Sequence, residues 1–127
     1  MRKTIEILRD YGIEVRPLSV SDYEEFYGGL LPDSSLKGYA FYLNGTLSGL
    51  GGVAITRSSY IVFSDIKENV RVGKVIIYRC AKEIMSLLDK LPSDRPILAF
   101  PDSRHKTAHR LLTSLGFKWF KGVYFYG

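Results

Sequence analysis

Residues 60–66 read Tyr-Ile-Val-Phe-Ser-Asp-Ile, and a long helical pattern follows them from residue 72 to residue 91. The first stretch is nearly all apolar until Ser64, which is typical of a central strand covered on both faces. In the second stretch the apolar residues recur with a helical period, at Ile77, Ala81, Ile84, Leu88 and Leu91, broadened by Val75, Cys80 and Leu87. Residues 96–100 are again apolar. The sequence therefore predicts a strand, a long helix and a second strand parallel to the first, joined by a right-handed crossover.

A strand and a short helix are predicted upstream of this unit. Residues 14–18 form the first strand, which Pro17 ends because it cannot donate to a ladder. Ser21 and Glu24 fit a capping box, so a short helix begins there and ends before Gly28-Gly29. Residues 4–10 fit either a short helix or an extension of the strand.

Two further strands complete a meander with residues 60–66. Residues 36–43 and 46–56 flank Asn44-Gly45, which is a strong hairpin signal. Three glycines weaken the second of these strands and indicate a bulge or close packing, namely Gly49, Gly51 and Gly52.

Downstream of residue 100 the sequence predicts a second helix and a terminal hairpin. The helix spans residues 105–115, and Gly116 supplies a left-handed cap. Short strands at 118–120 and 123–125 then end the chain.

The composition favours one soluble domain over residues 1–127. A single cysteine, Cys80, excludes an internal disulfide, and the absence of an apolar signal core favours a reducing cytoplasm. No apolar run approaches the roughly 20 residues needed to span a bilayer.

The two halves of the chain differ in charge. Residues 1–70 hold seven Lys and Arg against nine Asp and Glu, whereas residues 71–127 hold eleven against four, so the halves carry −2 and +7. The second half is expected to attract an anion: a phosphorylated cofactor, an acidic protein or a nucleic acid.

One segment and the order of elements resemble a known family. The segment is Ala108-His109-Arg110-Leu111-Leu112-Thr113-Ser114-Leu115-Gly116-Phe117. It is similar to the last helix of the GNAT family of acetyl-CoA-dependent N-acyltransferases, and the element order resembles that family over nearly the whole chain. The resemblance implies an α/β (α+β) fold with a mixed, mostly antiparallel sheet, a central parallel strand pair and flanking helices. Residues 63–66, followed by a helix with few glycines at its start, also resemble GNAT-like proteins of tailed bacteriophages. This second resemblance implies that the protein is located in the cytoplasm of a host cell or in a phage particle.

The resemblance implies that acetyl-CoA binds at the start of the long helix, with its pyrophosphate on the backbone amides. The corresponding loop is Asn69-Val70-Arg71-Val72-Gly73-Lys74, which has one glycine where the family has more. Arg71 and Lys74 are expected to compensate as phosphate contacts, although a plain helix start with solvated charges fits these residues equally well. His105, within a basic start to the last helix, is expected to meet the adenosine phosphate of coenzyme A or an acidic partner.

Catalysis in the family needs a polarised carbonyl, a base and an acid. The resemblance implies a polarising backbone amide at a bulge around Phe63, Ser64 and Asp65, with Asp65 or Glu68 as the base. The family's proton donor is a tyrosine at the position of Leu112, and leucine cannot donate a proton. Two substitutes are considered for this acid, His109 and Tyr124.

The sequence therefore predicts a weak or divergent N-acyltransferase that moves an acetyl group to an amine of a small molecule or a protein. The alternative is a GNAT-fold module without catalysis, which binds a protein partner or forms part of an assembly. His105 and His109 have metal-ligand spacing, but no nearby carboxylate or thiol completes a set, so no metal is predicted. Aromatic and basic residues near the C-terminus fit nucleic-acid binding only loosely, and the apolar terminal hairpin is a candidate homodimer edge.

Overall fold

Seven strands form one mixed sheet within the part of the chain that the computed structural model describes, which is residue 6 and residues 8–32, 34–67, 73–100, 111–120 and 123–126. The elements in chain order are β1 (Ile13–Pro17), α2 (Val20–Phe26), β2 (Ser35–Leu43), β3 (Thr46–Ile55), β4 (Tyr60–Ile66), α3 (Lys74–Ser86), the 3-10 helix η1 (Leu87–Lys90), β5 (Ile97–Ala99), β6 (Phe117–Phe120) and β7 (Val123–Tyr126). The strand order is β1-β2-β3-β4-β5-β7-β6. Glu6 and residues 8–10 are helical, so the first of the two alternatives for residues 4–10 holds where the structure describes them.

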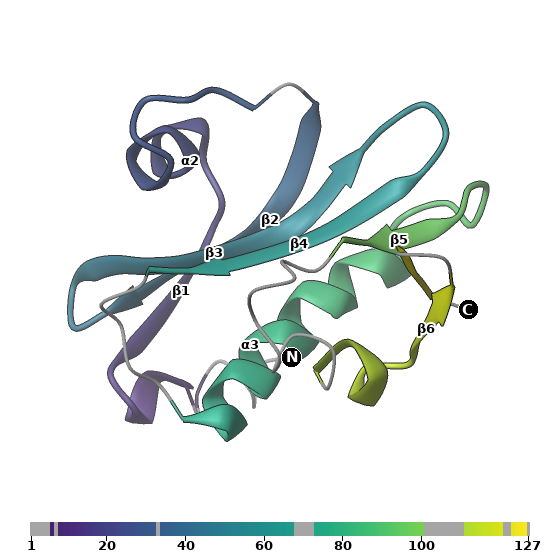
Figure 1. The fold of residues 1–127 in the computed structure, drawn as a ribbon. Coiled ribbons are helices and arrows are strands. Elements are labelled where there is room, and N and C mark those ends of the chain that lie inside the picture. Colours follow the sequence, from purple (N-terminus) through teal and green to yellow (C-terminus); the bar gives the residue numbers. More distant parts are fainter. Residues whose placement is uncertain are drawn as a thin grey trace.

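The strand β4 lies in the middle of the sheet. It forms, with β5, the one parallel pair among the described strands. It pairs antiparallel with β3 and parallel with β5, while all other neighbours are antiparallel. Figure 1 shows α3 on one face of the sheet and α2 on the opposite face. The predicted fold class is therefore confirmed: a mostly antiparallel sheet with a central parallel pair, flanked by helices.

The β2–β3 hairpin forms where the sequence predicts it. Asn44 and Gly45 have positive φ values of 50° and 85°, as a two-residue turn matched to the strand twist requires. Phe41 pairs with Gly49 whereas Tyr42 pairs with Leu47, so Ser48 is the extra residue of a bulge. The glycines of β3 therefore mark both a bulge and close packing, since a Cβ on Gly51 would meet Ile84 of α3.

Three hydrophobic clusters fill the space between the sheet and α3. The first holds Leu8, Ile13, Phe41, Ile76 and Ile84; the second holds Val53, Tyr60 and Leu87; the third holds Ala99, Phe117 and Tyr124. Val62 packs against all three clusters, so the side chains on this face of β4 belong to the core.

The buried face of α3 differs from the predicted one. Val75 was expected to broaden it, but its side chain is 65% exposed. Val75 lies about 100° round the helix from Ile76, which faces the sheet, and so points outward. The buried face instead includes Glu83, at 3% exposure, which an apolar pattern could not identify. The helix also tightens into η1 before Pro92 rather than staying α-helical to residue 91.

The capping box of α2 lies two residues earlier than predicted. Ser19, not Ser21, is the N-cap: its hydroxyl accepts from the Asp22 amide at 3.0 Å, and its own amide donates to Asp22 Oδ2 at 3.2 Å. Asp22 therefore supplies the carboxylate of the capping box, which was predicted to come from Glu24. Near the other end of the chain, residues 111–114 are helical and Gly116 has a φ of 101°, as predicted.

Candidate functional site

The parallel strands β4 and β5 stay paired over only part of β4. The pairs are Tyr60 with Ile97, Ile61 with Leu98, and Val62 with Ala99. Beyond Val62, β4 continues to Ile66 along β3. Within the described residues, the pairing of β4 with β5 therefore ends at Val62 and Ala99, and the last four positions of β4 pair with β3.

The backbone of β4 directs two amides toward this opening. The Tyr60 amide donates to the Pro96 carbonyl at 2.8 Å, on the β5 side, whereas the Lys67 amide donates to Ser48 on the β3 side at 2.9 Å. Successive residues of a strand direct their backbone groups to opposite edges. The amides of Ser64 and Ile66 therefore face the same side as that of Tyr60, where β5 has ended.

A bulge was expected around residues 63–65, and that expectation is wrong. The pairs from Gly49–Ile66 to Ile55–Tyr60 run without a register shift. The strand needs no bulge to direct the Ser64 amide away from β3, because the alternation of backbone groups along the strand already does so. The register shift lies instead between β2 and β3.

The two faces of β4 carry different groups at this end. Side chains alternate along a strand, so Ser64 lies on the same face as Val62, which packs in the core beneath α3. Phe63 and Asp65 lie on the opposite face, toward α2. The sequence placed these three residues in one site, and the structure divides them between its two sides.

On the α2 face, Asp65 has a partner that sequence reasoning missed. The Tyr27 hydroxyl donates a hydrogen bond to Asp65 Oδ2. Tyr27 follows α2 directly, and its ring packs on those of Tyr23 and Phe26, with centroid distances of 4.6 and 5.0 Å. Burial and the adjacent Asp65 carboxylate raise the pKa of Tyr27 well above its usual range. The phenol therefore stays protonated and remains a donor.

Within the described residues, the start of α3 has no capping side chain. Gly73 is the N-cap, with φ −68° and ψ 156°, no side-chain hydrogen bond caps it, and no acidic residue lies in the first turn. The amides of Ile76 and Ile77 donate to the Gly73 carbonyl at 3.1 Å, so the amides before them precede the first intrahelical bond. A Cβ built on Gly73 meets nothing within 4 Å. Free amides at the positive end of a helix are the usual binding groups for phosphate.

Several predicted site residues lie outside the described residues. They are Glu68, Val70, Arg71, Val72, His105 and His109. Lys74 is the first residue of α3. Their predicted roles stay predictions.

Tyr124 and Leu112 both lie beside the β5–β7 part of the core. Tyr124 is 4% exposed in a cluster with Ala99 and Phe117, and its ring centroid is 4.9 Å from that of Trp119. Leu112 is partly buried and packs against the same cluster. The role of Tyr124 as the acid stays a prediction, and the structure assigns it a packing role in the core.

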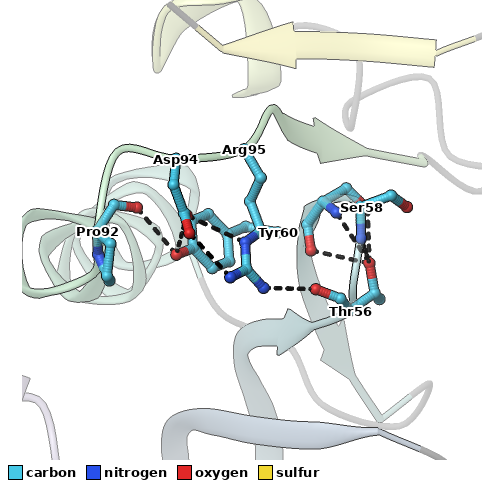
Figure 2. A network of polar contacts seen from close by, with 7 residues as sticks. Thr56, Ser58, Tyr60, Pro92, Asp94 and Arg95 are labelled. Atoms are coloured by element: carbon cyan, nitrogen blue, oxygen red, sulfur yellow. Dashed lines mark hydrogen bonds and ion pairs between the residues drawn. The ribbon is translucent and has the colours of Figure 1, made fainter.

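A polar network fixes the other end of the β4–β5 pair, as Figure 2 shows. The Tyr60 hydroxyl lies 2.9 Å from the Pro92 carbonyl oxygen and 3.0 Å from Asp94 Oδ1. Arg95 bonds Asp94 with two nitrogens, each at 3.0 Å, and donates to the Thr56 carbonyl at 2.6 Å. The network joins the β3–β4 turn to the segment before β5. These contacts connect the two segments at the paired end of β4 and β5.

Comparison with known proteins gives matches at the level of structure. The sequence matches no protein-family model and no curated protein. A solved structure of the E. coli N-acetyl transferase candidate YhhK bound to coenzyme A aligns over 90% of this chain and 97% of its own, with 15% identity and a TM-score of 0.61. Ribosomal-protein-S5-alanine acetyltransferase from Vibrio fischeri aligns over 84% and 80%, with 16% identity and a TM-score of 0.60. The Campylobacter jejuni N-acetyltransferase PseH aligns over 90% and 95%, with 15% identity and a TM-score of 0.57.

No helix in the described ranges is long and apolar enough to cross a membrane. The element order, the parallel pair β4–β5 and these structural likenesses lead to one conclusion: the chain has the fold of the GNAT N-acetyltransferases.

Proposed function

We propose that the protein is an acyl-CoA-dependent N-acyltransferase that moves an acetyl group from acetyl-CoA to an amine. The observation that carries the proposal is the end of the β4–β5 pairing at Val62 and Ala99, beyond which the Ser64 amide faces away from β3. A neighbour of the same fold binds coenzyme A, which supports the same cofactor here.

The described residues fit this cofactor at two points. The uncapped start of α3 at Gly73 offers free amides to the pyrophosphate, with room around the glycine. The open edge of β4 offers the Ser64 amide to the thioester carbonyl, where a fixed donor stabilises developing negative charge. Arg71 and Lys74 are the proposed phosphate contacts, and His105 is the proposed contact for the adenosine phosphate. Bound acetyl-CoA supplies an acetyl group on a thioester, whose transfer forms a carbon–nitrogen bond and breaks a carbon–sulfur bond.

The chain's own residues would manage the protons. Asp65 accepts a proton from the acceptor's ammonium, either directly or through water, and releases it to solvent. Its side chain is exposed on the α2 face, next to the strand position whose amide faces the opening. Glu68 is the second proposed base. The departing thiolate takes a proton from solvent, or from His109 or Tyr124.

The acceptor side of the molecule is acidic, which favours a cationic amine. The short helix α2 carries Asp22, Glu24 and Glu25 and no basic residue. Glu24 and Glu25 line an open concavity with Val20, Ser21 and Gly29. The acceptor is an amine of a small molecule or of a protein.

A specific observation favours the alternative, a GNAT-fold module without catalysis. Leu112 occupies the position of the family's proton-donating tyrosine and packs against the cluster of Ala99, Phe117 and Tyr124. In that case the protein acts as a binding or structural part, in the cytoplasm or in a phage particle. The strand β6, outermost in the sheet, carries Trp119 with 54% exposure and is the proposed edge for a homodimer or a protein partner.

Calorimetry with acetyl-CoA tests the proposal. We expect weak, saturable binding, and we expect Arg71→Ala and Lys74→Ala each to weaken it by about 1 to 3 kcal/mol. Lys90→Ala is the matched control, because it removes an exposed cation at the far end of α3 and η1. Absence of heat with the intact protein at millimolar ligand would support the module without catalysis. An equal loss in Lys90→Ala would show that only net charge matters.

A further inference from the structure

Phe26, the last residue of α2, and Tyr27, which follows it, contact the end of β4 and the residue just beyond it. Tyr27 donates its hydroxyl hydrogen to Asp65 Oδ2. One residue earlier, the ring of Phe26 lies 5.7 Å from the ammonium nitrogen of Lys67. Asp65 and Lys67 are two residues apart on an extended segment, so both side chains lie on the α2 face. The end of α2 is therefore attached to the site at the position of the proposed base.

The start of the same helix is attached to the sheet in a similar way. Tyr42 of β2 donates its hydroxyl hydrogen to Asp22 Oδ1, while Ser19 bonds the other oxygen. The guanidinium of Arg16 lies over the Tyr42 ring at 4.1 Å from its centroid. A tyrosine–carboxylate bond thus holds each end of α2. The bond at Tyr42 lies away from the opening between β4 and β5, and the bond at Tyr27 lies beside it.

We propose that Tyr27 is a positioning residue that orients the Asp65 carboxylate to accept the proton of the acceptor amine. The inference rests on the proposed function, and it adds the element that prepares the base. The carboxylate accepts one hydrogen bond from the residues that the structure describes, on Oδ2 from Tyr27. This bond fixes the plane of the carboxylate and leaves Oδ1 for the ammonium. The proton passes from the amine nitrogen to Oδ1, and Tyr27 keeps its own proton throughout.

Among the described residues, the titratable and charged groups on the elements packed against Asp65 are Tyr23 of α2, Tyr27 directly after α2, and Lys67 beyond β4. The neighbouring strand β3 places Leu50 opposite Asp65 and contains no charged residue. On α2, Asp22 is bonded to Tyr42, and Glu24 and Glu25 line the concavity described above.

The test compares Tyr27→Phe with Tyr42→Phe, because each removes one hydroxyl and one bond to a carboxylate at opposite ends of the same helix. The first readout is thiol release from acetyl-CoA with butylamine, spermidine and an alanyl peptide as acceptors, followed from pH 5 to 9. We expect Tyr27→Phe to lower kcat/KM by about 10- to 100-fold, as misplaced catalytic groups do, with the KM for acetyl-CoA unchanged. Tyr42→Phe keeps the wild-type kcat/KM.

A second readout is independent of turnover. Carbon-detected NMR at one fixed pH follows the chemical shift of the Asp65 carboxyl carbon, which should change in Tyr27→Phe and stay the same in Tyr42→Phe. If Tyr27→Phe does not fold, 3-fluorotyrosine at position 27 replaces it, since a more acidic hydroxyl of nearly the same size donates more strongly. The chemical shift should then move in the opposite direction.

The outcomes separate this inference from the function on which it rests. If Asp65→Asn removes turnover while Tyr27→Phe behaves like Tyr42→Phe, the positioning role is overturned and the acyltransferase stands. Full turnover in Asp65→Asn would overturn both the base and its positioning residue, again without removing the acyltransferase. If the wild-type chain neither binds acetyl-CoA nor releases thiol, the proposed function fails and this inference fails with it.

Discussion

Ile84 of α3 lies directly over Gly51 of β3, so close that a Cβ on Gly51 would stand 2.2 Å from Ile84 Cδ1. The same Cβ would lie 2.9 Å from the Phe63 carbonyl oxygen of β4. The absence of a side chain at Gly51 therefore lets the long helix approach the sheet next to the strand that carries the candidate site.

Gly51→Ala is expected to destabilise the protein by about 1 to 3 kcal/mol, the usual cost of overpacking a core. Urea unfolding would measure the loss. Ile84→Val, which lacks Cδ1, should restore part of the stability in the double variant, because the two residues are in contact. Strictly additive losses in the double variant would show that the clash lies elsewhere, with the Phe63 carbonyl as the next candidate.

Gly73→Asp should raise stability and reduce cofactor binding at the same time. An aspartate at the N-cap satisfies a free amide and complements the helix dipole, which contributes roughly 0.5 to 1 kcal/mol. A side chain fits there without contacts, and the backbone is already extended. The added negative charge would repel the pyrophosphate of acetyl-CoA. Thermal unfolding and calorimetry on one preparation measure both effects, and Gly73→Ser, which caps without charge, is the control. Unchanged affinity in Gly73→Asp would place the phosphates away from this helix start.

Cys80 should be inert in the folded protein. Burial and the nearby Glu83 raise the pKa of its thiol from 9.0 to about 12, so the reactive thiolate is about a thousandfold rarer than in an unfolded chain at pH 8. Iodoacetamide should therefore label it at the rate of unfolding. Rapid labelling of the native protein at pH 8 would contradict this burial.

The same thiol gives a pH dependence of stability with a definite sign. Above about pH 9 the unfolded chain releases the proton that the folded chain keeps, so the free energy of unfolding falls as the pH rises toward 12. Cys80→Ala lacks the group and is the matched control. Urea unfolding at pH 8 and pH 10 should show a larger loss in the wild type than in Cys80→Ala, and equal losses would contradict the shift.

Local signals were sufficient for the order and direction of the elements. Asn44-Gly45 specifies its turn through the positive φ values that these residues tolerate, and Pro92 and Gly116 limit their helices. The apolar run at 60–66 and the helical period after it predict the parallel unit, because a crossover helix is the usual route between parallel strands. The N-cap was predicted at Ser21 but lies at Ser19, because Asp22 rather than Glu24 completes the capping box.

The candidate site was less predictable, since its contacts are long-range. Asp65 was identified as a strand-end carboxylate, but its partner Tyr27 is 38 residues away. The spacing of Tyr23 and Tyr27 places both rings on one side of a short helix, and this was the available signal. Nothing in the sequence shows which face of the sheet that helix covers. Glu83 was missed for a related reason: a charged residue within an apolar helix pattern is assigned to the solvent face unless its neighbours are known.

Restoring a hydroxyl at position 112 tests turnover most directly. We expect low activity in the wild type, because the resemblance to the family implies that Leu112 takes the place of its proton donor, and positioned acid catalysis contributes roughly 10² to 10⁴ in rate. Leu112 packs against Ala99, Phe117 and Tyr124, at the edge of the core cluster that also contacts Val62 of β4. Leu112→Tyr should therefore increase thiol release from acetyl-CoA with a panel of amines. Leu112→Phe is the control, since it has the same ring without the hydroxyl and reports the cost of the larger side chain alone.

The comparison of these two variants decides between the enzyme and the module without catalysis. A gain in the tyrosine variant and none in the phenylalanine variant identifies missing acid catalysis in an otherwise complete site. If the wild type already turns over briskly and Leu112→Tyr gives no gain, another residue is the acid, and His109→Ala and Tyr124→Phe become the informative changes. Tyr124→Phe keeps the buried ring that packs with Ala99 and Phe117, so a loss of rate without a loss of stability would assign the proton to its hydroxyl. If no variant binds acetyl-CoA or releases thiol, catalysis is excluded. A pull-down then compares the wild type, whose β6 edge exposes Trp119, with Trp119→Ala, and a protein partner should be captured by the wild type alone.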